Sequence, residues 1–216
     1  MSLSAAIPPS SLPTYILSGG KSSRFGSDKA RTLVDGRENI LVLVDQLRRV
    51  GSEVTIVAQR VGDYQDLGVH TIADWASESG PLAGVLTALI DLEAKVESTE
   101  EGSLHHGIEP KSCWIVPCDL LVFRTEWIET LQRAHRSDRW ITLFRSETFR
   151  PFPGIYSISL LGAGLDAWRR GVRSMRGLVA EVDASIAWVD VTDGDLPSSF
   201  NTRDEFERAL RRESEA

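Results

Sequence analysis

The 216-residue sequence has little cysteine, no excess of basic residues and no long hydrophobic run. Its two cysteines, Cys113 and Cys118, lie on one expected strand with their side chains on opposite faces, so we expect no disulfide between them. The net charge of −7 argues against broad nucleic-acid binding. No run reaches the roughly 20 apolar residues of a transmembrane helix, and the start MSLSAAIPPSSLP lacks the features of a signal peptide. The sequence therefore predicts a cytoplasmic protein that binds neither nucleic acid nor membranes.

The length and the 42% hydrophobic content are typical of one globular α/β domain. We expect this single domain to span residues 13–210, after a flexible leader at 1–12. Strand-like and helix-like segments alternate, which predicts a mainly parallel sheet between layers of helices. Two later strands are too close in the sequence for a long crossover helix, so the sheet is predicted to be mixed.

The expected elements follow from apolar runs and helical periodicity. Strands are predicted at 14–18, 53–59, 69–73, 113–119, 140–144, 152–158 and 185–191. Helices are predicted at 39–50, 81–93, 126–135, 159–171, 174–182 and from 202 onward. Residues 94–112 are polar and acidic without periodicity, and we interpret them as an exposed insertion.

A basic, glycine-containing loop follows the first expected strand, in LSGGKSSRFGSDKA at 17–30. Gly19 and Gly20 have no Cβ, so backbone N–H groups could approach a ligand closely. Lys21, Arg24 and Lys29 add positive charge at the strand end where open α/β sheets bind ligands. The spacing is neither that of a P-loop nor GxGxxG, and the glycines alone fit a tight structural turn equally well. Together with the cations, they favour a phosphate-binding site.

Asp119 ends an apolar strand, where an unpaired buried carboxylate would be costly. We expect it to hold a cation, and Mg²⁺ shared with phosphates and water fits a single carboxylate. The alternative is that Asp119 caps the segment that follows. Asp28 is expected to structure the first loop or to pair with a neighbouring cation. Cys118 is expected to be a small buried residue rather than a nucleophile, and His105 and His106 are expected to face solvent.

Several segments together resemble the nucleotidyltransferases whose first loop reads LxGGxSxRMGxxDK, most closely the molybdenum cofactor guanylyltransferase (MobA) family. Besides the first loop, these segments are ESGPLAGVLTAL (78–89), IVPCDL (115–120), FNTRDEF (200–206) and the arginine-bearing GVRSMRGLV (171–179). The resemblance extends from about residue 14 to 207. Phe25 replaces the usual methionine, LVF follows Asp119 in place of a small-and-proline continuation, and Ser199 replaces the first Asn of the motif NxNT.

The resemblance implies a Rossmann-like nucleotidyltransferase of the GT-A type, a three-layer α/β sandwich. It implies a transferase of molybdenum cofactor biosynthesis that moves GMP from GTP to molybdopterin, releases pyrophosphate and uses Mg²⁺. Maturation proteins of molybdoenzymes are further expected partners. The implied catalytic residues are Lys29, Asp119 and Arg24, with Asp119 binding the metal. The implied GTP-binding residues are Leu17, Ser18, Gly19, Gly20, Lys21, Lys29, Asp74, Gly80, Pro81, Leu82 and Gly84. The candidates for the pterin phosphate are Arg150, Arg173, Arg176 and Asn201.

Alternatives remain open at this point. Asp74 also fits a surface turn, segment 78–89 an ordinary proline-started helix, and Asn201 a cap of the final helix. The arginines also fit solvated surface positions. Family members that use CTP tend to carry LAAG, so the pair Gly19-Gly20 together with Pro81-Leu82 resembles the guanine-selecting version. The whole chain could instead act on another phosphorylated acceptor such as a sugar phosphate, use CTP, or bind nucleotides as a non-catalytic accessory protein.

Overall fold

The computed structural model describes residues 12–19, 28–76, 80–102, 111–120, 124–192, 196, 199–200 and 202–214. Its strands are β1 (Thr14–Ser18), β2 (Leu33–Val34), β3 (Arg37–Glu38), β4 (Val54–Ala58), β5 (Thr71–Ala73), β6 (Ser112–Pro117), β7 (Ile141–Arg145), β8 (Gly154–Ser157) and β9 (Ile186–Asp190). Its α-helices are α1 (Asn39–Arg49), α2 (Pro81–Gly102), α3 (Thr125–Ala134), α4 (Leu161–Arg169), α5 (Met175–Val182) and α6 (Arg203–Ser214). Short 3₁₀ helices are η1 (Lys29–Arg31), η2 (Gln65–Leu67), η3 (Ile158–Leu160) and η4 (Asp183–Ser185). Within the described ranges, no helix has the length and apolar character needed to cross a membrane.

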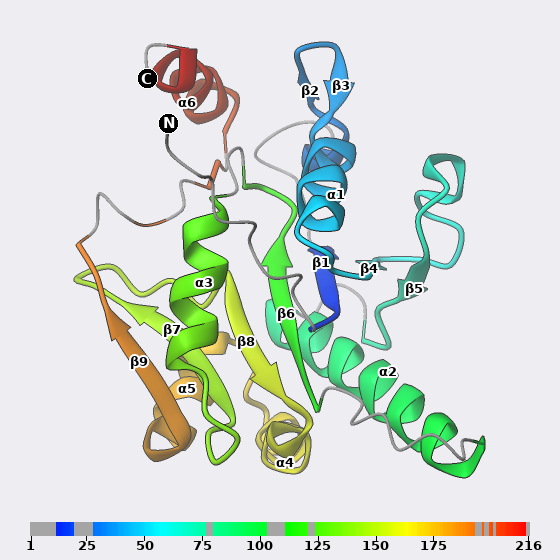
Figure 1. Cartoon of the computed structure of the whole chain (residues 1–216), viewed down its shortest axis with the longest axis vertical. Coiled ribbons are helices and arrows are strands. Elements are labelled where there is room, and N and C mark those ends of the chain that lie inside the picture. Colours follow the sequence, from blue (N-terminus) through cyan, green and yellow to red (C-terminus); the bar gives the residue numbers. More distant parts are fainter. Residues whose placement is uncertain are drawn as a thin grey trace, which may run out of the picture.

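Seven strands form one sheet in the order β5-β4-β1-β6-β8-β7-β9 (Figure 1). Strand β8 runs antiparallel to both of its neighbours, and the other neighbouring strands are parallel. The prediction of a mixed, mainly parallel sheet is therefore confirmed. The small hairpin β2–β3 is separate from this sheet and was not predicted.

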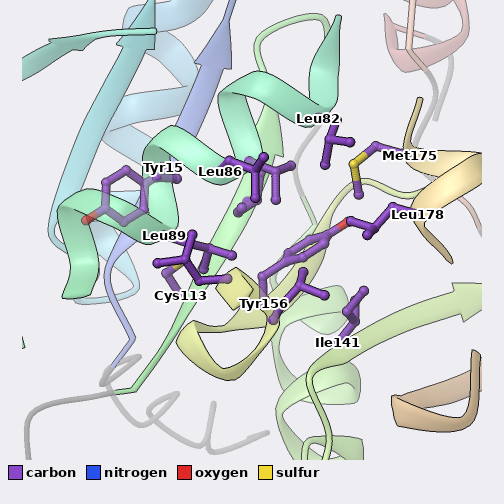
Figure 2. Close-up of a cluster of buried hydrophobic side chains, with 14 of the residues drawn as sticks. Tyr15, Leu82, Leu86, Leu89, Cys113, Ile141, Tyr156, Met175 and Leu178 are labelled. Atoms are coloured by element: carbon purple, nitrogen blue, oxygen red, sulfur yellow. The ribbon is translucent and has the colours of Figure 1, made fainter. Parts of the chain in front are cut away.

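Two apolar cores cover the two faces of the sheet. On β1, Tyr15 and Leu17 face the core that includes α2, α4 and α5, whereas Ile16 faces the core that includes α1 and α3. The alternation follows from the two-residue period of a strand and gives three layers. Figure 2 shows the first core, in which leucines of α2 lie against the sheet residues Cys113 and Tyr156. Both cysteines are free, and Cys118 packs against the second core, as the opposite-face prediction requires.

The chain order creates a crevice beside β1. From β1 the chain continues to β4 and β5 on one side and then crosses through α2 to β6 on the other side. Open α/β sheets bind ligands at such a switch point, beyond the carboxyl ends of the strands. The carboxyl ends of β1 and β6 are hydrogen-bonded to each other, because the Cys118 N–H donates to the Leu17 carbonyl at 3.1 Å.

The end of α2 differs from the prediction. The helix does not end near Glu93 but continues to Gly102, so residues 94–102 are helical. Lys95 lies 3.0 Å from Asp91 one turn earlier, and Val96 is buried at 6% exposure. Alanine, lysine and glutamate are good helix formers, so the charged composition of this stretch indicated a solvated helix as well as a loop. Residues 103–110 of the predicted insertion lie outside the described residues, and Ser112, its last residue, is instead a buried part of β6.

The C-terminal helix packs through a small core of its own. Phe200 and Phe206 stack edge to face with 4.9 Å between ring centroids, and Val34 and Leu210 pack against them. These contacts join α6 to the hairpin β2–β3, and both lie at the same end of the molecule (Figure 1). The helix begins with a capping box, in which Thr202 and Glu205 bond each other's backbone N–H groups at 3.2 Å.

Candidate active site

A cleft of about 920 Å³ opens at the carboxyl ends of β1, β4 and β6. Of the predicted nucleotide-binding residues, those that line it are Leu17, Ser18, Gly19, Lys29, Asp74, Gly80, Pro81 and Gly84. Asp119 and Arg150 also line it. Gly20, Lys21, Arg24 and Asn201 lie outside the described residues, so their roles stay predictions. The structure thus brings the glycine end of β1 and the strand-end acid into one space.

Leu82 and Gly84 differ in their relation to this cleft, which Gly84 lines and Leu82 does not. Leu82 is fully buried in the core beside Met175 (Figure 2) and does not line the cleft among the described residues. At Gly84, a Cβ would lie 3.1 Å from the Leu17 side chain, so glycine here serves helix packing against the strand. Gly80 has φ of +91°, a conformation that favours glycine.

Lys29 and Asp119 face each other across the cleft. The Lys29 Nζ lies 3.8 Å from Asp119 Oδ2, and the two side chains are 16% and 21% exposed. Burial raises the pKa of the Asp119 carboxyl, while the Lys29 charge partly opposes this rise. The carboxylate is therefore held in a site where additional positive charge stabilises its ionised form.

Asp119 fits a magnesium ion that is bound mainly by water and substrate phosphates rather than by protein side chains. Among the described residues, no three His, Cys, Asp or Glu side chains gather closely enough to hold a metal by themselves. These described side chains therefore form no closed cage around an ion there. Mg²⁺ usually takes one or two carboxylates and fills its remaining positions with water and substrate phosphates, so a single partly buried Asp119 fits it.

A hydrogen-bond network holds the segment that carries Lys29. Asp28 caps η1 by accepting a bond from the Ala30 N–H at 2.9 Å. Its other carboxylate oxygen accepts a bond from the Tyr64 hydroxyl at 2.7 Å, and the Ser18 hydroxyl donates to Tyr64 at 2.6 Å. The predicted loop-structuring role of Asp28 is confirmed. The network ties Lys29 to the end of β1.

Arg31 occupies the outer side of the same network. Its guanidinium donates to both carboxylate oxygens of Asp66, at 2.7 and 2.8 Å, and to Glu38 at 3.0 Å. It also lies 5.1 Å from the centre of the Tyr64 ring. These bonds raise the pKa of Arg31 above its ordinary value, so the group stays charged.

Asp74 structures a turn and also lines the cleft, and its role in binding the nucleotide stays a prediction. Its Oδ1 accepts bonds from the Thr87 hydroxyl and the Ala76 N–H, both at 3.1 Å, which structures the turn after β5. It also lines the cleft, and a Cβ at Gly19 would lie 3.9 Å from its Oδ2. The second carboxylate oxygen therefore faces the glycine end of β1.

The opposite wall consists of residues 149–152. The core anchors it, because the hydroxyl of the buried Tyr156 donates to the Pro151 carbonyl at 2.6 Å. Arg150 lies in this wall, whereas Arg176 lies behind it, 4.7 Å from the ring centre of Phe149. Of the three arginines predicted to bind the pterin phosphate, all of which are described, Arg150 lines the cleft and Arg173 and Arg176 do not.

Arg173 is engaged elsewhere. Its guanidinium lies 3.9 Å from the ring centre of Trp168, and its Nη1 donates to the Trp168 carbonyl at 2.6 Å. It does not line the cleft among the described residues. Its backbone does approach the cleft rim, since a Cβ at Gly80 would lie 3.2 Å from the Arg173 carbonyl oxygen.

Sequence reasoning missed several cleft residues, among them Gln59, Arg60 and Tyr64. Gln59 and Arg60 follow β4 directly and line the cleft. Their position after a parallel strand was a usable signal, because this is the ligand-binding edge of the sheet. Tyr64 offered no such signal, since it follows a turn and acts through distant partners. Cys118 also lines the cleft, but burial raises its pKa to about 12, so it remains a thiol as expected.

Comparison with known proteins agrees with this geometry. The sequence model of the MobA-like NTP transferase domain matches residues 14–185. The chain is 27% identical over 196 residues to a "Probable molybdenum cofactor guanylyltransferase" of Flavobacterium johnsoniae, covering 90% of this chain and 94% of the relative. It is 30% identical over 205 residues to the "Molybdenum cofactor guanylyltransferase" of Rhizobium rhizogenes, covering 89% and 87%.

Solved structures share the fold. The Archaeoglobus fulgidus "Molybdopterin-guanine dinucleotide biosynthesis protein A" superposes with a TM-score of 0.73 at 19% identity, covering 95% of this chain and 100% of that one. A CMP:2-keto-3-deoxy-manno-octonic acid synthetase complexed with CTP superposes with a TM-score of 0.66 at 12% identity, covering 94% and 98%. The predicted Rossmann-like nucleotidyltransferase fold is confirmed.

Proposed function

Because the chain belongs to the MobA-like NTP transferase family, we propose that it is a cytoplasmic enzyme that transfers GMP from GTP to molybdopterin and releases pyrophosphate. The observation that carries the proposal is the common cleft of Gly19, Lys29 and Asp119, with 3.8 Å between Lys29 Nζ and Asp119 Oδ2. Relatives named molybdenum cofactor guanylyltransferase, matched over most of their length, support the choice of donor and acceptor.

The donor nucleotide would lie along the rim formed by β1 and α2. Backbone N–H groups near Ser18 and Gly19 and the ammonium of Lys29 would hold its phosphates. The rim at Gly80 and Pro81 would receive the guanine, because neither residue has a bulky side chain. We expect Lys21 and Arg24 to add charge to this phosphate site.

The acceptor would enter from the opposite wall, with Arg150 binding the pterin phosphate. Its phosphate oxygen attacks the α-phosphorus of GTP, and the bond to pyrophosphate breaks. The acceptor is already an anion, so the reaction needs no general base, and orientation together with charge neutralisation supplies the acceleration. Lys29 would neutralise charge that grows on the α-phosphate. Asp119 would hold Mg²⁺, which neutralises phosphate charge when bound.

The direct test incubates the purified protein with GTP labelled at the α-phosphate, molybdopterin and Mg²⁺. We expect label in a molybdopterin–GMP product and one pyrophosphate for each product formed. Lys29→Ala should abolish most transfer, and Arg150→Ala should raise the KM for molybdopterin while leaving the KM for GTP unchanged.

Thermal shifts with GTP, CTP and UTP test the donor, because a bound ligand stabilises the fold by mass action. A larger shift with CTP or UTP than with GTP would replace the guanine assignment. GTP binding without pyrophosphate release in the presence of molybdopterin would favour an accessory role.

A further inference from the structure

Asn39, the first residue of α1, is a polar side chain with only 1% of its surface exposed. Its Nδ2 group donates to the Cys118 carbonyl at 2.9 Å and to the Leu120 carbonyl at 3.0 Å. An amide NH₂ has two hydrogens, so these bonds use its full donor capacity. The two carbonyls flank Asp119 on either side.

The carbonyl of Asp119 itself also has a distant donor. It accepts a bond from the Phe200 N–H at 3.2 Å, and Leu120 forms an isolated bridge with Ser199. The three successive carbonyls of 118, 119 and 120 are therefore bound from α1 and from the segment before α6. This short turn carries the acid and has no regular secondary structure of its own beyond that bridge.

Asn39 is also bound to the segment that carries Lys29. Its backbone N–H donates to the Thr32 carbonyl at 2.8 Å, and the Thr32 N–H donates to the Lys29 carbonyl at 3.2 Å. One buried residue is thus bonded to the turn that bears the carboxylate and, through Thr32, to the 3₁₀ helix that bears the ammonium. The two charged groups come from segments about 90 positions apart, and Asn39 joins them at a single point.

We propose that Asn39 is a positioning residue that holds Asp119 at its distance from Lys29 and so prepares the carboxylate to bind a divalent cation together with a nucleoside triphosphate. The inference rests on the proposed function. Groups that orient metal-binding side chains from behind change metal affinity about 10- to 100-fold when they are removed. The side chain must donate twice to do this, which an aspartate or an apolar residue at 39 cannot.

The experiment uses the full chain, Mn²⁺ as a paramagnetic substitute for Mg²⁺, and an α,β-methylene analogue of GTP that cannot be cleaved. Electron paramagnetic resonance measures the Kd for Mn²⁺ in the presence of the analogue. We expect Asn39→Ala to weaken Mn²⁺ binding about 10- to 100-fold. Asn39→Ser keeps one donor, so a smaller loss is expected, and it serves as the readout should the alanine variant not fold. Affinity for the analogue in excess chelator should stay unchanged.

Ser52→Ala is the matched control. Ser52 is 5% exposed and donates to the Leu12 carbonyl at 2.9 Å. It lies just before the amino end of β4, whereas the cleft is at the carboxyl end of this strand. It should lower the Tm as Asn39→Ala does, without changing the Mn²⁺ affinity. Equal Mn²⁺ affinity in the parent and Asn39→Ala proteins, or an equal loss in Ser52→Ala, would overturn the inference alone. Failure of the parent to bind Mn²⁺ with the analogue would overturn the proposed function as well.

Discussion

Replacing Tyr64 by phenylalanine removes one oxygen from the cleft and two hydrogen bonds with it. The Ser18 hydroxyl loses its acceptor at 2.6 Å, and the Asp28 carboxylate loses its donor at 2.7 Å. Asp28 caps the 3₁₀ helix that begins at Lys29, so the change reaches the ammonium through a single intermediate residue. We therefore expect Tyr64→Phe to lower both the stability of the fold and the rate of transfer.

The size of the stability loss follows from the two bonds. A neutral hydrogen bond contributes about 1 kcal/mol and a bond to a carboxylate about 1.5–3 kcal/mol. The Asp28 side chain is 42% exposed, so water replaces part of the second contribution. The expected loss is about 2 kcal/mol, or about 4–8 °C in Tm for a domain of this size. Displacement of a substrate-binding group by about 1 Å lowers the rate by up to about 100-fold.

Tyr15→Phe provides the control, because it removes the same kind of bond elsewhere. The Tyr15 hydroxyl donates to Asp91 at 2.7 Å, and Tyr15 does not line the cleft among the described residues. Calorimetry should show a comparable Tm loss for both variants, while only Tyr64→Phe should lose GMP transfer. Equal transfer rates in the two variants would refute the reasoning that the Tyr64 network positions Lys29.

Three further predictions concern single side chains. Burial raises the pKa of Asp119, so ionisation of this carboxyl destabilises the ligand-free fold as pH rises through that pKa. Without metal at pH 8, Asp119→Asn should therefore have a higher Tm than the parent protein, and in the transfer assay it should be inactive. A lower Tm than that of the parent would contradict this. Burial lowers the pKa of His135, so stability should fall as pH drops below the ordinary histidine value of about 6.5, and urea titrations of His135→Gln should lack this fall. Gly84→Ala gains about 1 kcal/mol of helix propensity, but its new Cβ would lie 3.1 Å from the Leu17 side chain. Denaturation should therefore show little change in the free energy of unfolding, while the KM for GTP should rise. An unchanged KM would contradict a role of Leu17 in shaping the donor site.

The architecture was predictable because each element carries its own periodicity. The strand at 14–18 was predicted at its observed bounds, and the helix at 39–50 ends one residue earlier in the structure. The same alternation predicted a mainly parallel sheet, and the carboxyl ends of its strands place Gly19 and Asp119 in one cleft. The largest error in an element's bounds is the C-terminal end of α2, which was predicted near Glu93 and lies at Gly102. It arose because a sequence rich in glutamate is compatible with both a helix and a solvated loop.

The supporting contacts of the site were not predictable in the same way. Asn39 bonds residues that are 79 and 81 positions away, and Tyr64 bonds partners 36 and 46 positions away. No local pattern distinguishes such a side chain from a helix-starting asparagine or an ordinary core tyrosine. Arg173 shows the converse, since the family resemblance made it a candidate for the pterin phosphate, although its guanidinium bonds the end of the preceding helix α4.

The site is built so that its charged groups are held by uncharged ones. Asp119 and Lys29 each lie in short segments, a turn and a 3₁₀ helix, where their mutual attraction and solvation would otherwise set their positions. Asn39 and Tyr64, both nearly buried, bond the backbone or the cap of those segments. Because these bonds are made within the chain, they contribute to ordering the two segments on folding. Such preorganisation is what a reaction driven by orientation and charge neutralisation requires.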